Sequence, residues 1–281
     1  MLLAVEPPVT LGTSPLPGTF EAWVADWLAL PDPLQRLAAH VPGPRELPFE
    51  GEIPGAQVCA RRILPPPRPA RWQVATRARR SVGGKALTLP AARNALLHTF
   101  LHHEMQAAEL FAHALLAYPD APDPWRRGLL GLIADELDHA RRYSVLLRDR
   151  GVVYGDLPVG DWFWERALTA QSPAAFLALI GLGLEGANLD HTARFSARFA
   201  AAGDAHAADL VAAVGHEEIA HVRFAVRWFA RFAGAFDLEH WRAHLPAPFT
   251  ERPFVHLPLA RVERERAGFP PALLDRLERE Q

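Results

Sequence analysis

Two Glu-x-x-His units stand out in the sequence, Glu136…His139 and Glu218…His221. In a helix, residues three positions apart project from the same face, so each unit offers a carboxylate beside an imidazole. Carboxylate and imidazole groups are common donors to divalent transition metals. The two units therefore predict metal-ligating positions on two helices.

Each unit is preceded by another glutamate at nearly the same distance. Glu104 lies 32 residues before Glu136, and Glu185 lies 33 residues before Glu218. The chain thus repeats one pattern, a single glutamate followed about one helical hairpin later by Glu-x-x-His. All four glutamates fall on apolar helical stripes, where an unpaired buried charge is costly.

If the repeat faces inward, it supplies four carboxylates and two imidazoles around one cavity. The predicted ligands are Glu104, Glu136, His139, Glu185, Glu218 and His221. This is the ligand set of di-iron and di-manganese carboxylate bundles, in which two divalent ions balance the four carboxylates. Because oxygen donors with neutral nitrogen favour Fe(II) or Mn(II), we expect two metal ions, iron first, as Fe/Fe or Mn/Fe.

Several neighbouring residues are weaker candidates. Glu217 could replace Glu218, but only Glu218 has the three-residue spacing to the following histidine. Tyr143 is either a core tyrosine, the more common case, or a redox-active phenol beside the metals. Of the pair His102 and His103, at most one can approach the cavity edge. Glu109 lies off the stripe of its helix, so we expect it to be exposed.

The periodicity of apolar residues predicts four long helices, of the length found in four-helix bundles. They cover residues 89–118, 124–151, 173–203 and 205–234. Proline near the start and glycine at the end support these limits, as at Pro90 and Gly151. Shorter helices are expected at residues 20–30, 32–41, 162–170, 237–245 and 270–280.

The predicted fold is all-α, a ferritin-like four-helix bundle over residues 90–235. Residues 1–89 are too rich in proline for long helices and should form a helical and extended arm packed on the bundle, with a short strand near residues 71–76. Residues 236–281 should form a short helical tail.

The sequence also resembles a known bacterial family. The blocks "LLHTFLHHEMQAAEL", "ADELDHARRYSVLLRDRGVVYGDLP", "GLEGANLDHTARF", "EEIAHVRFAVRWF" and "PFVHLPLARVERERAGF" resemble the ferritin-like family catalogued as domain of unknown function 455. The resemblance runs from about Ala91 to Phe269. It implies a ferritin-like bundle with a dinuclear metal centre and brings no assigned reaction. More distantly, the pattern is similar to ferritins, tRNA-modifying hydroxylases and multicomponent monooxygenases.

In that wider group, a carboxylate just before Glu-x-x-His often orients a metal-bound histidine. Asp135 and Glu217 hold those positions in this sequence, so the resemblance implies that they support the histidines. Many relatives have an arginine just before the first of these histidines, where this chain has Asp138.

Composition and charge limit the remaining possibilities. The single cysteine, Cys59, excludes an internal disulfide and fits a reducing compartment. The start, "MLLAVEPPVTLG", has no basic region before its short apolar stretch, so we expect no signal peptide, a cytoplasmic protein and no membrane partner.

Nine Lys or Arg residues and no acidic residue lie between Ile53 and His103. We expect this basic segment to lie on the acidic body of the chain, and an anionic partner is the alternative.

These features favour an O₂-activating oxidase or hydroxylase of a small molecule, with an external electron donor and a homodimer both compatible with the sequence. Gly181, Gly183, Gly186 and Ala187 around Glu185 are expected to leave room for substrate. The alternatives are a ferroxidase or iron-handling protein, and an RNA-modifying hydroxylase that grips phosphates through the basic segment. The proline-rich arm and the tail fit the compact subunit of a storage shell poorly.

Overall fold

The computed structural model describes residues 14–75 and 87–280. Within these ranges the chain forms helices and no strand, which confirms the all-α prediction. A single bridge between Val74 and Val159 stands where a short strand was expected. No helix in the described part of the chain is both long and apolar enough to cross a membrane. The predictions for the first twelve residues and for the basic residues of 76–86 fall outside the described ranges.

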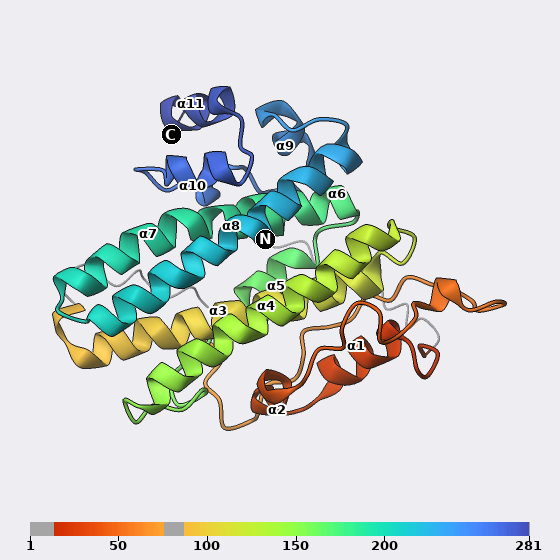
Figure 1. The fold of residues 1–281 in the computed structure, drawn as a ribbon, viewed down its shortest axis with the longest axis horizontal. Coiled ribbons are helices and arrows are strands. Elements are labelled where there is room, and N and C mark those ends of the chain that lie inside the picture. The colour runs from red at the N-terminus through yellow and green to blue at the C-terminus, as the bar shows by residue number, and fades with distance from the viewer. Residues whose placement is uncertain (1–13, 76–86, 281) are drawn as a thin grey trace, which may run out of the picture. The chain divides into compact units, whose positions relative to one another are not determined.

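The four long helices lie where the periodicity predicted them, within a few residues (Figure 1). Three are α3 (Pro90–Ala117), α4 (Asp123–Arg148) and α8 (Ala205–Ala233), and the other is continuous through α6 (Pro173–Phe176), η3 (Leu177–Glu185) and α7 (Gly186–Ala201). Local chemistry explains their limits. The side chains of Ser172 and Asp204 accept hydrogen bonds from the first turns of α6 and α8. Gly234, with φ of 90°, ends α8 in a left-handed conformation that favours glycine.

The third long helix departs from the prediction of a regular α-helix. Over η3 its hydrogen bonding is π-helical, and this segment ends on Glu185. π-Helical turns are rare and occur frequently at functional sites. Within η3, a Cβ added to Gly181 would lie 2.4 Å from the Cβ of Ala225 on α8. The two helices therefore approach each other too closely for any side chain at that position.

The chain divides into two compact units, of which the first comprises Met1–Pro69 and Ala108–Ala134. It contains α1 (Phe20–Ala29), α2 (Pro33–Ala38) and η1 (Glu50–Glu52). Glu109 is fully buried in this unit and accepts hydrogen bonds from Arg36 and Arg68. The prediction that Glu109 is exposed was wrong, because its partners come from the arm, distant in sequence.

Arginines of the basic segment pair with carboxylates of this same chain. In the first unit, Arg61 donates to both oxygens of the buried Glu50, at 2.7 and 3.0 Å, and Arg68 pairs with Glu109 as described above. In the second unit, Arg93 lies 2.9 Å from Asp204. Since Glu50 is itself part of the arm, these contacts serve both to fold the arm and to attach it to helical residues.

The second unit comprises Ala70–Ala107 and Asp135–Gln281. In it, α7 and α8 pack along each other, and the tail helix α10 (Arg261–Arg266), which the sequence did not predict, packs against both (Figure 1). The unit also contains α5 (Trp162–Ala167), α9 (Leu238–His244), η4 (Arg252–Phe254) and α11 (Pro271–Arg279).

A buried ion pair anchors the tail to α7. Arg264 of α10 donates to both oxygens of Asp190, at 3.1 and 2.8 Å, and both side chains are fully buried. Asp190 also accepts from the backbone N–H groups of His256 and Ala260. The carboxylate thus holds three separate points of the tail.

Candidate metal centre

The six predicted ligands meet in the second unit. Each is buried, with at most 6% of any of them exposed, and they come from α3, α4, η3 and α8. Their donor atoms form two groups, in each of which all atoms lie within 4.8 Å of one another. One group is Glu104, Glu136, His139 and Glu218, and the other is Glu136, Glu185, Glu218 and His221. Such buried groups could hold metal ions.

Glu136 and Glu218 belong to both groups. Nδ1 of His221 lies 2.8 Å from Oε1 of Glu136 and 3.0 Å from Oε2 of Glu218. Nδ1 of His139 lies 3.3 Å from the other oxygen of Glu218 and 3.7 Å from that of Glu136. Each of these two carboxylates therefore turns one oxygen toward each histidine. Glu104 and Glu185 each belong to one group only.

The donor atoms are close together without being satisfied by one another. Among the described residues, both oxygens of Glu136 and of Glu218, and Nδ1 of His139 and of His221, make no aligned hydrogen bond. Buried polar atoms are rarely left in this way. Atoms that approach to about 3 Å but are not aligned with each other fit ligands that point at a common third atom. The residues present therefore suit a metal ion.

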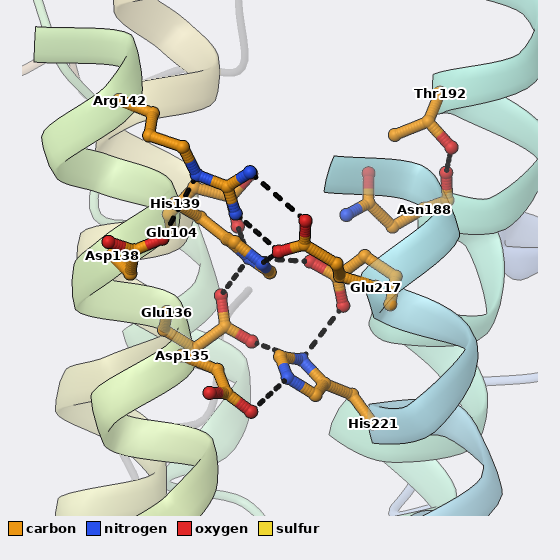
Figure 2. Close-up of polar contacts among 11 residues, drawn as sticks. Glu104, Asp135, Glu136, Asp138, His139, Arg142, Asn188, Thr192, Glu217 and His221 are labelled. Carbon is orange, nitrogen blue, oxygen red and sulfur yellow. Dashed lines mark hydrogen bonds and ion pairs between the residues drawn. The ribbon is translucent and has the colours of Figure 1, made fainter. Parts of the chain in front are cut away.

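The outer nitrogen of each histidine meets a carboxylate from the other Glu-x-x-His helix (Figure 2). Nε2 of His139 lies 3.0 Å from Glu217, and Nε2 of His221 lies 3.2 Å from Asp135. A carboxylate accepts here, so Nε2 carries the proton and Nδ1 presents its lone pair inward when the ring is neutral. Asp135 on α4 thus contacts His221 on α8, and Glu217 on α8 contacts His139 on α4.

Arg142 joins this network, although no sequence motif indicated it. Its guanidinium donates to both oxygens of Glu217, and its Nε lies 3.0 Å from Asp138 (Figure 2). The Arg142 hydrogen bonds are the largest influence on the pKa of Glu217 and lower it. Asp138 is exposed and pairs with Arg142.

Electrostatics show how the metal-free cluster balances its charge. Burial, followed by the charges of Glu136 and Glu218, raises the pKa of Glu104 and of Glu185 well above the usual value. Burial lowers the pKa of His139, but the Glu136 and Glu218 carboxylates outweigh it and raise the pKa to about 11. The pKa of His221 is raised in the same way. Protons therefore occupy the cluster, and metal binding must release them.

A cavity of about 510 Å³ adjoins Glu104 and Glu185. Aromatic side chains line much of it, namely Phe100, Trp162, Phe163, Phe195 and Phe254. His103 also lines the cavity, whereas His102 bonds the Tyr154 hydroxyl at 2.7 Å. Only one of this histidine pair therefore reaches the cavity, as predicted.

The glycines near Glu185 do not provide this space. A Cβ on Gly183 would lie 3.1 Å from Phe254, and one on Gly186 would lie 3.6 Å from Arg264. Gly181 and Gly183 thus allow close packing of α8 and of the tail, whereas a Cβ on Gly186 would be in ordinary van der Waals contact. Of the four small residues predicted to leave room, only Ala187 lines the cavity. The prediction that the glycines leave room for substrate was wrong, because residues distant in sequence fill it.

Tyr143 is buried, and burial followed by the charge of Glu104 raises its pKa well above the usual value.

Comparison with known proteins identifies the family to which the chain belongs. The family model described as protein of unknown function (DUF455) matches residues 42–275. The chain belongs to the DUF455 family. The match begins within the arm, well before Ala91, so the arm from residue 42 onward is part of what this DUF455 chain shares with its family. No curated protein and no solved structure matches the chain.

The proton content of the cluster predicts an unusual pH dependence for the metal-free DUF455 chain. Between pH 7.5 and 9.5 the folded state keeps a proton on His139, whose pKa is about 11, while the unfolded histidine has lost it. The stability that comes from such a raised pKa is fully present at a pH below the pKa of the unfolded state. It is lost as the pH rises toward the pKa of the folded state. The free energy of unfolding should fall on the order of 1 kcal/mol per pH unit for each retained proton.

Urea unfolding of chelator-treated protein at pH 7.5 and 9.5 tests this expectation, with metal-loaded protein as the control. Desolvation lowers the pKa values of His103, His113 and His191 to about 3, so in this window they are neutral in both the folded and unfolded states. A metal-free chain whose stability does not change over these two pH units would contradict the prediction.

The outer carboxylates predict a graded effect on metal affinity. Asp135→Asn and Glu217→Gln keep the shape but remove the charge that orients each histidine, so binding should weaken roughly 10–100-fold without loss of the site. Asp209→Asn, at an exposed position on α8, is the matched control. Metal titration gives the affinity of all three variants. Unchanged affinity in both Asp135→Asn and Glu217→Gln would mean that these carboxylates are solvated surface groups that do not support the histidines.

Proposed function

We propose that this chain is a ferritin-like dinuclear metal protein that acts as an O₂-activating oxidase or hydroxylase on a small organic substrate. One observation carries the proposal, namely that two four-donor groups share Glu136 and Glu218. A pair of carboxylates common to two neighbouring donor groups suits two metal ions, and Glu136 and Glu218 would help to hold both. Each ion would have its own histidine and its own single glutamate.

The donor chemistry supports iron or manganese. Each donor group combines three carboxylates with one imidazole, a hard set that suits Fe(II) and Mn(II) better than soft-metal alternatives. Four carboxylates and two divalent ions sum to zero charge, as a buried site requires. We propose iron as the resident metal, as Fe/Fe or Mn/Fe.

The chain's own residues would bind the metal ions, hold the histidine rings in orientation and keep water away from the substrate. When bound, an iron pair supplies the electrons for O₂ reduction, and an external donor restores them. Glu104 and Glu185 belong to the donor groups and also line the cavity, so substrate in the cavity would lie beside the site. The aromatic part of the lining would disfavour water in that space. The outer pairs with Asp135 and Glu217 hold the two rings in a fixed orientation.

An iron-handling protein without organic substrate is the second candidate, since it would use the same ligands. The cavity favours the enzyme, because about 510 Å³ beside the donors lies within the range of small-molecule sites. An RNA-modifying hydroxylase has less support, since Arg61, Arg68 and Arg93 of the basic segment already pair with carboxylates of the chain.

Elemental analysis of anaerobically purified and reconstituted protein tests the proposal. We expect two metal ions per chain, followed by consumption of O₂ when the reduced protein is mixed with it. A single zinc per chain, or no stoichiometric metal after reconstitution, would rule out the dinuclear site. Gel filtration separates the candidates further, because an iron store would elute as a large cage.

A further inference from the structure

Two arginines of α7 line the cavity together with Glu185. Asn188, His191, Arg194 and Arg198 follow Glu185 at intervals of three or four residues, and all of them line the cavity. They form one face of the helix. The helix axis advances about 13 Å over the nine residues from Glu185 to Arg194. The cavity therefore has a carboxylate donor at one point of its wall and cationic groups more than two turns away.

These arginines have no anionic partner in the described part of the chain. Neither forms an ion pair or hydrogen bond there, and the buried Nε of Arg194 has no acceptor. Their closest aromatic contact is Phe195, whose ring centroid lies 5.4 Å from each guanidinium carbon. The nearby Asp190 is already occupied by Arg264. Arg61 and Arg68, by contrast, each pair with a buried carboxylate.

Among the residues that the structure describes, Glu104 and Glu185 are the only acidic ones that line the cavity. Both of these belong to the donor groups of the metal centre. The rest of the lining includes the five aromatic side chains, of which Phe100 and Phe195 have ring centroids 5.4 Å apart, together with Asn188 and three histidines. The cavity thus combines an apolar body with a cationic end.

We propose that this cavity binds an amphipathic organic anion, in which an apolar or aromatic body carries one carboxylate or phosphate group. The anionic group lies at Arg194 and Arg198, and the body extends along the aromatic wall toward Glu104 and Glu185. Guanidinium groups bind both anions through paired, charge-assisted hydrogen bonds, which are stronger than neutral ones. This inference rests on the proposed function for the role of the ligand as substrate, but the binding itself does not require metal.

Calorimetric titration of the full chain with three probes of equal body tests the inference. The probes are biphenyl-4-carboxylate, biphenyl-4-yl phosphate and the neutral biphenyl-4-methanol. We expect the better anion to bind about 10–100-fold more tightly than the alcohol, and the two anions to reveal whether a carboxylate or a phosphate is preferred. In Arg194→Gln with Arg198→Gln, this preference over the alcohol should disappear while the alcohol binds as before.

Arg227→Gln is the matched control, because Arg227 is exposed on α8 and does not line the cavity. It should leave all three affinities unchanged. Failure of every probe to bind, equal affinity for alcohol and anions, or an unchanged preference in the double variant would each overturn the inference. Circular dichroism checks that the double variant remains folded, as expected for two partly exposed side chains.

The titrations are made on both metal-free and metal-loaded protein, so that the two proposals fail separately. Anion binding to metal-free protein that depends on the arginines supports this inference even if no metal is ever bound. Two bound metals without such anion binding would leave the proposed metal centre in place and overturn the assignment of the cavity.

Discussion

Glu136→Gln and Glu218→Gln are each expected to abolish stoichiometric metal binding, whereas Glu104→Gln and Glu185→Gln should each retain about one ion. The reason is the sharing of donors, because Glu136 and Glu218 belong to both four-donor groups and the other two glutamates to one each. A shared glutamate removed from the site deprives both positions of a ligand and leaves the buried charge unbalanced. Elemental analysis after reconstitution and desalting measures the metal content.

Comparing the metal content of the four variants is a stricter test than measuring any one variant alone. All four substitutions replace one buried carboxyl group and keep nearly the same volume, so a general loss of fold would affect them alike. Glu165→Gln, an exposed position on α5, serves as the surface control and should keep two ions. Two ions retained in Glu136→Gln would refute its role as ligand, and one ion retained there would remove it from the shared position.

Arg264→Gln should lower the free energy of unfolding by about 3–5 kcal/mol, the usual cost of breaking a buried ion pair from one side. It leaves Asp190 fully buried with only two backbone N–H donors. Arg261→Gln, three residues earlier on α10, is the matched control. Arg261 pairs with Glu265, Asp275 and Glu278 at the exposed surface, so its loss should cost less than about 1 kcal/mol.

Urea unfolding of the metal-loaded protein compares the two arginine variants. A cost for Arg264→Gln no greater than that of Arg261→Gln would mean that the pair with Asp190 does not anchor the tail. Because Phe254 and His256 of the tail line the cavity, loss of this anchor should also weaken ligand binding there.

The helices and the ligands could be predicted because their causes are local or periodic. The limits of the long helices follow from nearby prolines, glycines and capping side chains, such as Pro90 and Ser172. The glutamates and histidines were recognisable since charged groups on an apolar stripe need a common explanation, and the repeat supplied it. The spacing of three residues fixed which side chains share a face.

The features that were missed depend on partners far away in the sequence. Glu109 is buried because Arg36 and Arg68 reach it from the arm, 73 and 41 residues away. Gly183 packs against Phe254 of the tail, which no local pattern indicates. The crossed pairs of Asp135 with His221 and Glu217 with His139 require the relative rotation of two helices. Arg194 and Arg198 could have been found, since they continue the face of Glu185 at helical spacing.

The π-helical segment makes the length of one stretch a determinant of the site. A π-turn corresponds to one residue more than an α-turn holds, and each residue of an α-helix turns its successors by about 100°. The π-helical turns thus hold an extra residue while α6 and α7 keep their directions. A further residue inserted into Leu177–Glu185, which these turns do not absorb, would rotate α6 against α7 by about that angle. If Arg264 keeps α7 in place through Asp190, then the residues before Glu185 must turn, and Gly181 would no longer face Ala225. If α7 turns instead, Glu185 leaves the donors and the arginines leave the cavity together. Insertions here should therefore be far more damaging than substitutions of similar size.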